Sequence, residues 1–191
     1  MQAVVLDGSG AGDGEMGAPR ELLVRELQAR GWQVDTRALR EAAIAPCRGC
    51  FGCWITTPGT CVIDDDNRAL TRAVYDADLV ALFTPITFGG YSSTLKRALD
   101  HWIPLISPFF RRFHGETHHP MRYARRLSVL GVGVLAQPDA ESEDIFRNLL
   151  QRNARNLDDA RHAAVVWVAG QGTQPMRAAL TRGLGELEVT P

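Results

Sequence analysis

The sequence lacks any long hydrophobic run. Its longest apolar segment, residues 127–136, is well short of the roughly 20 residues that a membrane-spanning helix needs. The amino terminus also lacks a basic stretch followed by an apolar one, which is the pattern of a secretory signal. We therefore expect a cytoplasmic protein that makes no contact with a membrane.

The sequence also lacks an excess of charge of either sign. Its 21 Lys and Arg residues nearly balance its 22 Asp and Glu residues, for a net charge of -1. A basic surface for nucleic acid is therefore not predicted. No internal repeat, low-complexity tract or long linker interrupts the 191 residues, so we expect a single domain over residues 1–191.

Cysteine is scarce, and all of it falls within fifteen positions. A secreted disulfide framework usually spreads its cysteines along the chain, so this clustering favours a metal, redox or packing role in a reducing compartment. Two, two and seven residues separate the four successive cysteines, which are Cys47, Cys50, Cys53 and Cys61.

Three interpretations of the cysteine segment remain open. Thiolates at this spacing can ligate an iron–sulfur cluster, with the fourth cysteine returning from the loop. Zinc is a competitor, although tetrahedral zinc sites more often use two separated pairs. Alternatively, the thiols are small buried side chains packed against Phe51 and Trp54.

Hydrophobic patterning predicts strands that alternate with helices. Mostly apolar strands in such an alternation indicate a parallel sheet covered on both faces. The right-handed crossover rule then favours an α/β fold with a doubly wound, five-stranded sheet in the order 2-1-3-4-5. The predicted strands are 3–7, 33–38, 79–84, 127–135 and 163–169; helices are predicted from Pro19, after residues 64–66, from Ser92, over 142–157 and in the tail from Gly170.

The loop after the first strand is a candidate phosphate cradle. Ligands of open α/β sheets bind beyond the carboxyl ends of the strands. The glycines of residues 8–17 let backbone N–H groups turn toward an anion at the start of the next helix, where Gly10 is a candidate ligand. Asp13 would repel a phosphate, which Arg20 or the Ser9 hydroxyl could offset. The alternative is a flexible glycine-rich turn.

The turn after the third strand is a candidate site for a flat ring. Pro85 fixes the exit of the strand, two glycines permit close approach of the backbone, and Phe88 or Tyr91 could stack on the ring. A Pro/Gly turn between a strand and a helix can also exist without a ligand. The candidate ring-binding residues are Thr84, Pro85, Ile86, Thr87, Phe88 and Gly89.

Histidines and one apolar segment complete the candidates. Residues 114–119 contain three histidines, but a polar surface loop is favoured over a metal site there. His101 and His162 are interpreted as surface or helix-packing residues. Residues 101–110 are too apolar for a solvated loop, so we expect them to cover a bound cofactor or a second subunit.

Several of these segments resemble one known family. Residues 47–54, 58–65 and 84–100 resemble flavodoxin-like NAD(P)H-dependent FMN reductases and their iron–sulfur flavoprotein relatives, and residues 104–123 resemble one branch of that group. The resemblance covers roughly residues 44–123. It implies a flavodoxin-like fold, FMN held by the first loop and by residues 84–89, reduction by NAD(P)H, and a homodimer or homotetramer.

The resemblance also bears on the cysteines and the first loop. Iron–sulfur members ligate a [4Fe–4S] cluster through a compact motif that the four cysteines match in number and approximate spacing, whereas related reductases keep several such cysteines without a cluster. Relatives usually follow Gly-Ser with Pro-Arg, but here residues 10–16 are glycine-rich and acidic, and His101 stands where an Arg often follows the Asp.

The favoured hypothesis is an FMN-dependent NAD(P)H oxidoreductase that passes electrons to a small-molecule or protein acceptor. It needs no catalytic acid or base, because the cofactor carries the chemistry. The alternatives are an iron–sulfur electron carrier and a flavin-free flavodoxin-like binding module. The flavin hypotheses require the turns after strands one and three to meet at a common edge.

Overall fold

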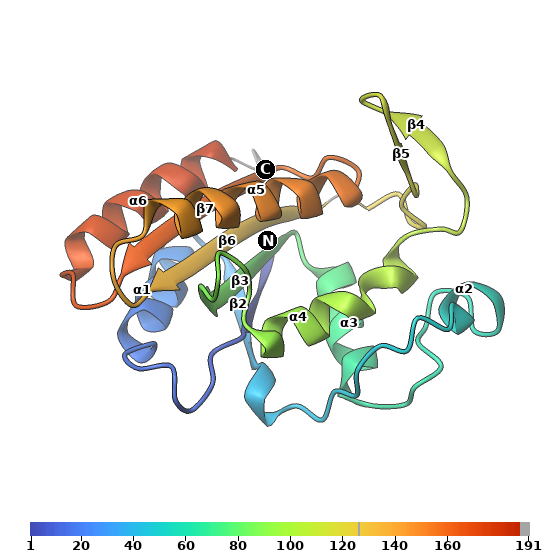
Figure 1. The fold of residues 1–191 in the computed structure, drawn as a ribbon, viewed down its shortest axis with the longest axis horizontal. Helices are drawn as coiled ribbons and strands as arrows, with labels where there is room; N and C mark the ends of the chain where they lie inside the picture. Colours follow the sequence, from blue (N-terminus) through green and yellow to red (C-terminus); the bar gives the residue numbers. More distant parts are fainter. Residues whose placement is uncertain (126, 188–191) are drawn as a thin grey trace.

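The computed structural model describes residues 1–125 and 127–187, and its centre is a parallel sheet of five strands (Figure 1). The strand order is β2-β1-β3-β6-β7. The expected order 2-1-3-4-5 differs in its numbering because two short strands, β4 and β5, precede the fourth strand of the sheet along the chain. The sheet strands are β1 (Gln2–Asp7), β2 (Gln33–Ala38), β3 (Leu79–Pro85), β6 (Ser128–Leu135) and β7 (His162–Val168).

Helices cover both faces of the sheet, as the apolar strands predicted. On β1, Val4 and Leu6 pack with the helices of one face, whereas Ala3 and Val5 pack with those of the other. Successive strand residues point to opposite faces, so one apolar strand supplies two cores. The first face carries α3 (Asp66–Asp76), α4 (Ser93–Leu99) and α5 (Ala140–Asn156), and the second carries α1 (Gly17–Ala29) and α6 (Thr173–Glu186).

Capping side chains fix where three of these helices begin. The Asp65 carboxylate accepts a hydrogen bond from the backbone N–H of Asn67, and the Asp139 carboxylate accepts one from Ser142. Ser92 does the same for Leu95 at the start of α4. Each cap satisfies a backbone donor that the first helical turn leaves unpaired.

The polar loop predicted for residues 114–119 is present only as the exposed turn at residues 114–115, and residues 116–118 are a strand instead. Residues 111–118 form an antiparallel hairpin of β4 (Arg111–Phe113) and β5 (Glu116–His118), which projects beyond the sheet (Figure 1). Glu116 is held by Arg152 and Arg155 of α5 and by His118. The two arginine contacts reach across more than thirty residues, so local sequence could not reveal them.

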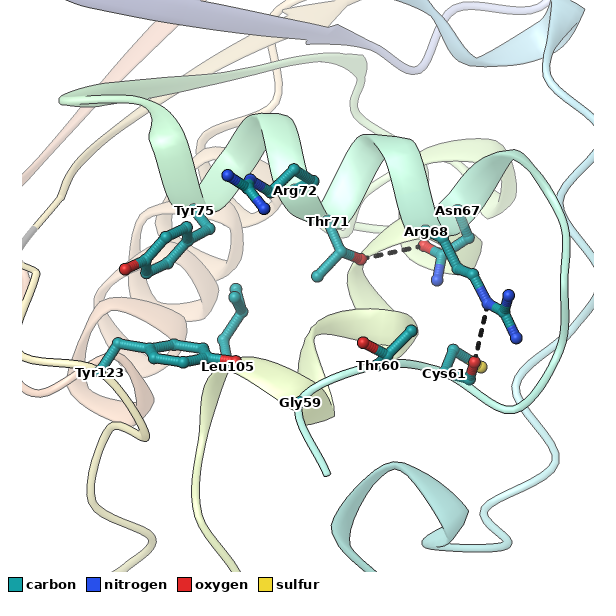
Figure 2. A pocket seen from close by; sticks show the side chains of 10 residues that line it. All are labelled: Gly59, Thr60, Cys61, Asn67, Arg68, Thr71, Arg72, Tyr75, Leu105 and Tyr123. Atoms are coloured by element: carbon teal, nitrogen blue, oxygen red, sulfur yellow. Dashed lines mark hydrogen bonds between the residues drawn. The ribbon is translucent and has the colours of Figure 1, made fainter. Parts of the chain in front are cut away.

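The apolar segment 101–110 is divided between core and surface. Leu105, at the end of the short helix η2 (Asp100–Leu105), is buried, whereas Phe109 and Phe110 are each 73% exposed. Beside η2, α3 borders a cavity that residues 59–61 and Tyr123 also line (Figure 2). Among the described residues, none of the helices has both the length and the apolar character required to span a bilayer.

Candidate functional site

The turns that leave β1 and β3 meet at the carboxyl edge of the sheet. The Gly8 N–H donates to the Phe83 carbonyl at 2.8 Å, and the Ser92 hydroxyl donates to the Gly8 carbonyl at 2.6 Å. A Cβ at Gly8 would lie only 2.5 Å from the Cβ of Leu95, so the contact requires glycine here. The common edge that the flavin hypotheses require is therefore present.

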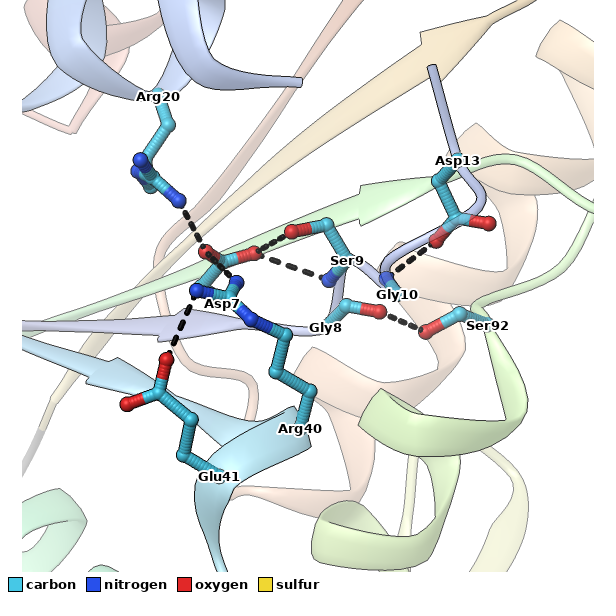
Figure 3. A network of polar contacts seen from close by, with 9 residues as sticks. All are labelled: Asp7, Gly8, Ser9, Gly10, Asp13, Arg20, Arg40, Glu41 and Ser92. Atoms are coloured by element: carbon cyan, nitrogen blue, oxygen red, sulfur yellow. Dashed lines mark hydrogen bonds and ion pairs between the residues drawn. The ribbon is translucent and has the colours of Figure 1, made fainter. Parts of the chain in front are cut away.

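In the first loop, the groups predicted to donate hydrogen bonds to a phosphate donate instead to carboxylates of the chain itself (Figure 3). The Ser9 N–H and hydroxyl both donate to Asp7 Oδ1, at 2.9 and 2.6 Å. Arg20 donates to Asp7 Oδ2 at 2.9 Å, and the Gly10 N–H donates to the Asp13 carboxylate. An anion at this loop must therefore displace Asp13 to reach the Gly10 N–H.

Asp7 organises this loop and was not among the site residues predicted from the sequence. Its carboxylate is fully buried, and a second guanidinium, that of Arg40, lies 3.7 Å from it. Two positive groups around one buried carboxylate offset the cost of burying its charge. The position of Asp7 at the very end of an apolar strand was the available signal, whereas nothing in the sequence placed Arg40 near it.

The second turn is a tight hairpin with an exposed aromatic tip. Thr87 and Gly90 exchange two backbone hydrogen bonds, of 3.0 and 2.8 Å, around Phe88 and Gly89. Both central residues have positive φ, 50° and 73°, which is typical of a two-residue loop that favours Asn-Gly. Phe88 is 98% exposed, so its ring is free to stack on a planar ligand.

The remaining residues of this turn hold it in place. The buried Thr84 hydroxyl accepts the Ser92 N–H at 2.9 Å. Ile86 donates its N–H to Val134 and packs its side chain against Gly133. Pro85 ends β3 itself. These contacts leave the backbone of the turn as the surface that a ring could approach.

Tyr91 does not have the stacking role that the sequence suggested. It is buried, its hydroxyl accepts a hydrogen bond from Asn153 of α5 at 3.1 Å, and its ring meets Phe146 edge-on. Burial raises the pKa of the Tyr91 hydroxyl to about 12. Tyr91 therefore belongs to the core that supports the turn.

The four cysteines are free thiols at different depths. Cys50 is exposed, Cys47 and Cys61 are half-buried, and Cys53 is buried on the short helix α2 (Gly52–Ile55). Burial first, and then electrostatic repulsion between a Cys53 thiolate and the neighbouring cysteines, raises the pKa of Cys53 to about 11. A thiol with a raised pKa is protonated at neutral pH and is a poor metal ligand until it loses its proton.

The cysteines do not fit an iron–sulfur cluster in this conformation. Within residues 1–125 and 127–187, no three His, Cys, Asp or Glu side chains come together in a way that could hold a metal ion. Phe51 stacks on Trp54 at 4.9 Å. The packing interpretation expected buried thiols, and of the four cysteines only Cys53 is buried.

The histidines have structural partners. His101 is buried and its Nε2 lies 2.7 Å from the Ala45 carbonyl, which links the start of the cysteine segment to η2. His162 Nδ1 lies 3.2 Å from the Ala160 carbonyl. His118 bridges Glu116 and Asn156. Glu116 has its pKa lowered to about 2, chiefly by Arg152 and then by His118.

Comparison with protein families gives one match over most of the chain. The model of a family described as NADPH-dependent FMN reductase matches residues 1–128. An iron–sulfur flavoprotein of Methanocaldococcus jannaschii is 34% identical over 101 residues, which are 48% of this chain and 51% of that protein. One from Methanosarcina thermophila is 32% identical over 76 residues, covering 40% and 39%. The chain spans about half or less of the length of these curated relatives.

Solved structures share the fold at low sequence identity. A putative quinone reductase from Klebsiella pneumoniae superposes with a TM-score of 0.67 at 15% identity, covering 99% of this chain and 85% of that one. An FMN-dependent NADH-azoreductase from Bacillus anthracis, in complex with FMN, gives a TM-score of 0.63 at 9% identity and covers 97% of each chain. These likenesses bear on the flavodoxin-like fold alone.

Proposed function

Because the chain belongs to the NADPH-dependent FMN reductase family, we propose that it is an FMN-dependent NAD(P)H oxidoreductase whose cofactor binds where the turns after β1 and β3 meet. The observation that carries this proposal is the direct bond between the turns, from the Ser92 hydroxyl to the Gly8 carbonyl. It places a loop of backbone donors beside a turn with an exposed aromatic tip. Flavodoxin-like sheets bind FMN at this kind of edge.

The ring side of the site is the turn after β3. Residues 84–89 would hold the isoalloxazine through their backbone, and Phe88 would cover one of its faces. The two bonds between Thr87 and Gly90 hold the tip, while Gly89 packs against Ile145 of α5. The residues of the turn therefore orient the ring without supplying an acid or a base.

The phosphate side of the site is the loop after β1. Ser9, Gly10 and Arg20 would hold the phosphate, aided by Arg40 near Asp7. Asp13 would have to leave the Gly10 N–H, and Arg20 would share its charge between Asp7 and the phosphate. The residues thus fit FMN once Asp13 leaves the Gly10 N–H and the Ser9 donors turn from Asp7 to the phosphate.

FMN, when bound, supplies the redox chemistry, taking hydride from a nicotinamide nucleotide and passing electrons to an acceptor. The acceptor is proposed as a small molecule or a protein, and the assembly as a homodimer or homotetramer. We derive no electron path through an iron–sulfur cluster, because the described cysteines do not form a metal site. The second candidate is the flavin-free binding module, which is favoured by the hydrogen bonds that the first-loop donors already make to Asp7 and Asp13.

Replacing the exposed ring tests the site. Phe88→Asn removes the aromatic ring but creates Asn-Gly, the preferred sequence for this turn, so the backbone is retained. Loss of one stacked, partly buried aromatic ring predicts FMN binding about tenfold weaker. The affinity is measured by quenching of flavin fluorescence during titration of flavin-free protein.

Phe51→Asn is the matched control, because Phe51 is also an exposed phenylalanine with positive φ before a glycine but lies outside both turns. It should leave FMN affinity unchanged. Equal affinity of the parent and Phe88→Asn would remove Phe88 from the site. A parent protein that takes up no FMN would overturn the proposed function and favour the flavin-free module.

A further inference from the structure

A cavity of about 320 Å³ lies beside α3 (Figure 2). Its walls come from α3, from residues 59–61, and from Leu105 and Tyr123. None of its lining residues belongs to the flavin site described above. The cavity therefore needs an explanation of its own.

A buried amide at one end of this cavity has an unused donor. Asn67 is 1% exposed, and its Oδ1 lies 3.5 Å from the Thr71 hydroxyl that donates to it. Its Nδ2 has no hydrogen-bond partner among the described residues, and Figure 2 shows the amide nitrogen directed toward residues 59–61 across the cavity. A buried donor without a partner is costly, so a ligand that supplies an acceptor would be stabilised there.

The charge around the cavity favours an anion. Arg68 and Arg72 line it, and its lining residues include no Asp or Glu among those the structure describes. Both guanidinium groups also pair with carboxylates outside the lining, those of Asp64 and Asp76. Asn67 and Arg68 lie in the first turn of α3, where the helix dipole adds partial positive charge.

The other end of the cavity is aromatic. The rings of Tyr75 and Tyr123 lie 4.7 Å apart, tilted by 58°, with Leu105 beside them. Tyr75 follows Asn67 by eight residues on the same helix, which is about 12 Å along its axis. A carboxylate at Asn67 and an aromatic body reaching toward the tyrosines would span this distance.

We propose that this cavity binds a small aromatic carboxylate, with the acid group on the Asn67 amide in the positive field of Arg68 and Arg72, and the ring system against Tyr75 and Tyr123. The site is separate from the flavin site, and the proposal does not depend on FMN binding. It gives the protein a second ligand site, and Cys61 is one of the residues that line it.

Calorimetric titration of the full chain with 2-naphthoate tests this site. Saturating FMN is present, so that the probe cannot occupy the flavin site. The neutral isostere 2-naphthamide serves as the ligand control. We expect one site for 2-naphthoate and at least tenfold weaker binding of the amide, in line with the strength of hydrogen bonds to charged groups.

Two variants locate the site. Asn67→Asp keeps the shape of the side chain, places a carboxylate where a helix start tolerates it, and should weaken 2-naphthoate binding about tenfold or more. Arg72→Gln changes an exposed residue, so it should fold normally and weaken binding about threefold. Arg177→Gln is the control, since Arg177 is also an exposed arginine in an ion pair but lies outside the cavity.

No binding of 2-naphthoate would overturn the proposal. So would equal affinity in the parent, Asn67→Asp and Arg72→Gln, because that would place the ligand elsewhere. Binding that occurs only when FMN is omitted would assign the probe to the flavin site and would also overturn it. Equal affinity for 2-naphthamide would overturn the assignment of an anion.

Discussion

Asp13 sets how readily the first loop accepts an anion. Its carboxylate holds the Gly10 N–H, which is one of the donors proposed for the FMN phosphate. The loop therefore contains its own competitor for the phosphate. The negative charge of Asp13, which the sequence predicts to be unfavourable for a phosphate, therefore lies at the Gly10 N–H, a donor that the phosphate needs.

Removing this carboxylate should strengthen FMN binding. Asp13→Ala frees the Gly10 N–H and removes a like charge, so we expect FMN affinity to rise about three- to tenfold. Riboflavin lacks the phosphate, and its affinity should not change. Both constants are obtained from titrations of flavin-free protein.

Glu15→Ala provides the comparison, since it removes the same charge from the same loop and leaves the Gly10 contact in place. A smaller effect than that of Asp13→Ala is expected. If the two variants behave alike, general charge rather than the Gly10 contact governs the loop. If riboflavin affinity rises as much as FMN affinity, the phosphate is not bound there.

At the scale of elements, the flavin turn depends on its packing against α5. Gly89 leaves no room for a side chain beside Ile145, and Tyr91 joins the start of α4 to Asn153 and Phe146 of α5. The turn is therefore held from its carboxyl-terminal side by a helix whose residues come more than fifty positions later. This support explains how a strained, exposed Phe88 keeps its position.

Burial of Tyr91 predicts a loss of stability at alkaline pH. Its folded-state pKa of about 12 lies above the ordinary value of 10, so the folded protein keeps a proton that the unfolded chain releases. The free energy of unfolding should therefore fall as pH rises from 10 toward 12, by roughly 2 kcal/mol for this one group. Cys53 acts in the same direction between pH 9 and 11.

Urea unfolding at pH 8, 10 and 11.5 measures this effect. Tyr91→Phe should be about 1 kcal/mol less stable than the parent at pH 8, because Asn153 loses its acceptor. Between pH 10 and 11.5 the variant should lose less stability than the parent does. Parallel losses in the two proteins would show that Tyr91 does not titrate as its burial implies.

For the whole molecule, the cysteine segment and the flavin edge are separate regions. Cys50 is exposed and lies outside both turns, and the described cysteines form no metal site. The segment joins the body through short contacts such as that between His101 and Ala45. Flavin content should therefore be independent of the exposed thiol.

An optical spectrum of protein purified without oxygen, paired with iron analysis, checks this independence. Cys50→Ala should show the same ratio of flavin to protein as the parent, with flavin bands alone. Loss of bound iron in the variant, together with broad brown absorbance in the parent, would support the iron–sulfur alternative instead. Phe88→Asn is the opposite control, since it should lower flavin content and leave the cysteines intact.

The sequence by itself determined the order of the five strands of the main sheet and the location of both turns. Apolar runs, caps and glycines act over a few residues, so the strands near residues 3–7, 33–38 and 79–84 could be predicted from local patterns. The family resemblance added FMN as the expected cofactor, and the family match agrees with it. These features depend on neighbours along the chain.

Only the tertiary structure decided which side chains are available to a ligand. In the folded chain, Tyr91 is buried in the core, and Arg20 and Arg40 pair with Asp7. Residues 111–118 contact α5, and a cavity forms between α3 and Tyr123. Each of these outcomes joins residues that are far apart in sequence or depends on how completely a neighbour buries them. Local sequence patterns carry no information about such distant partners, because these side chains come within contact distance of one another only when the chain has folded.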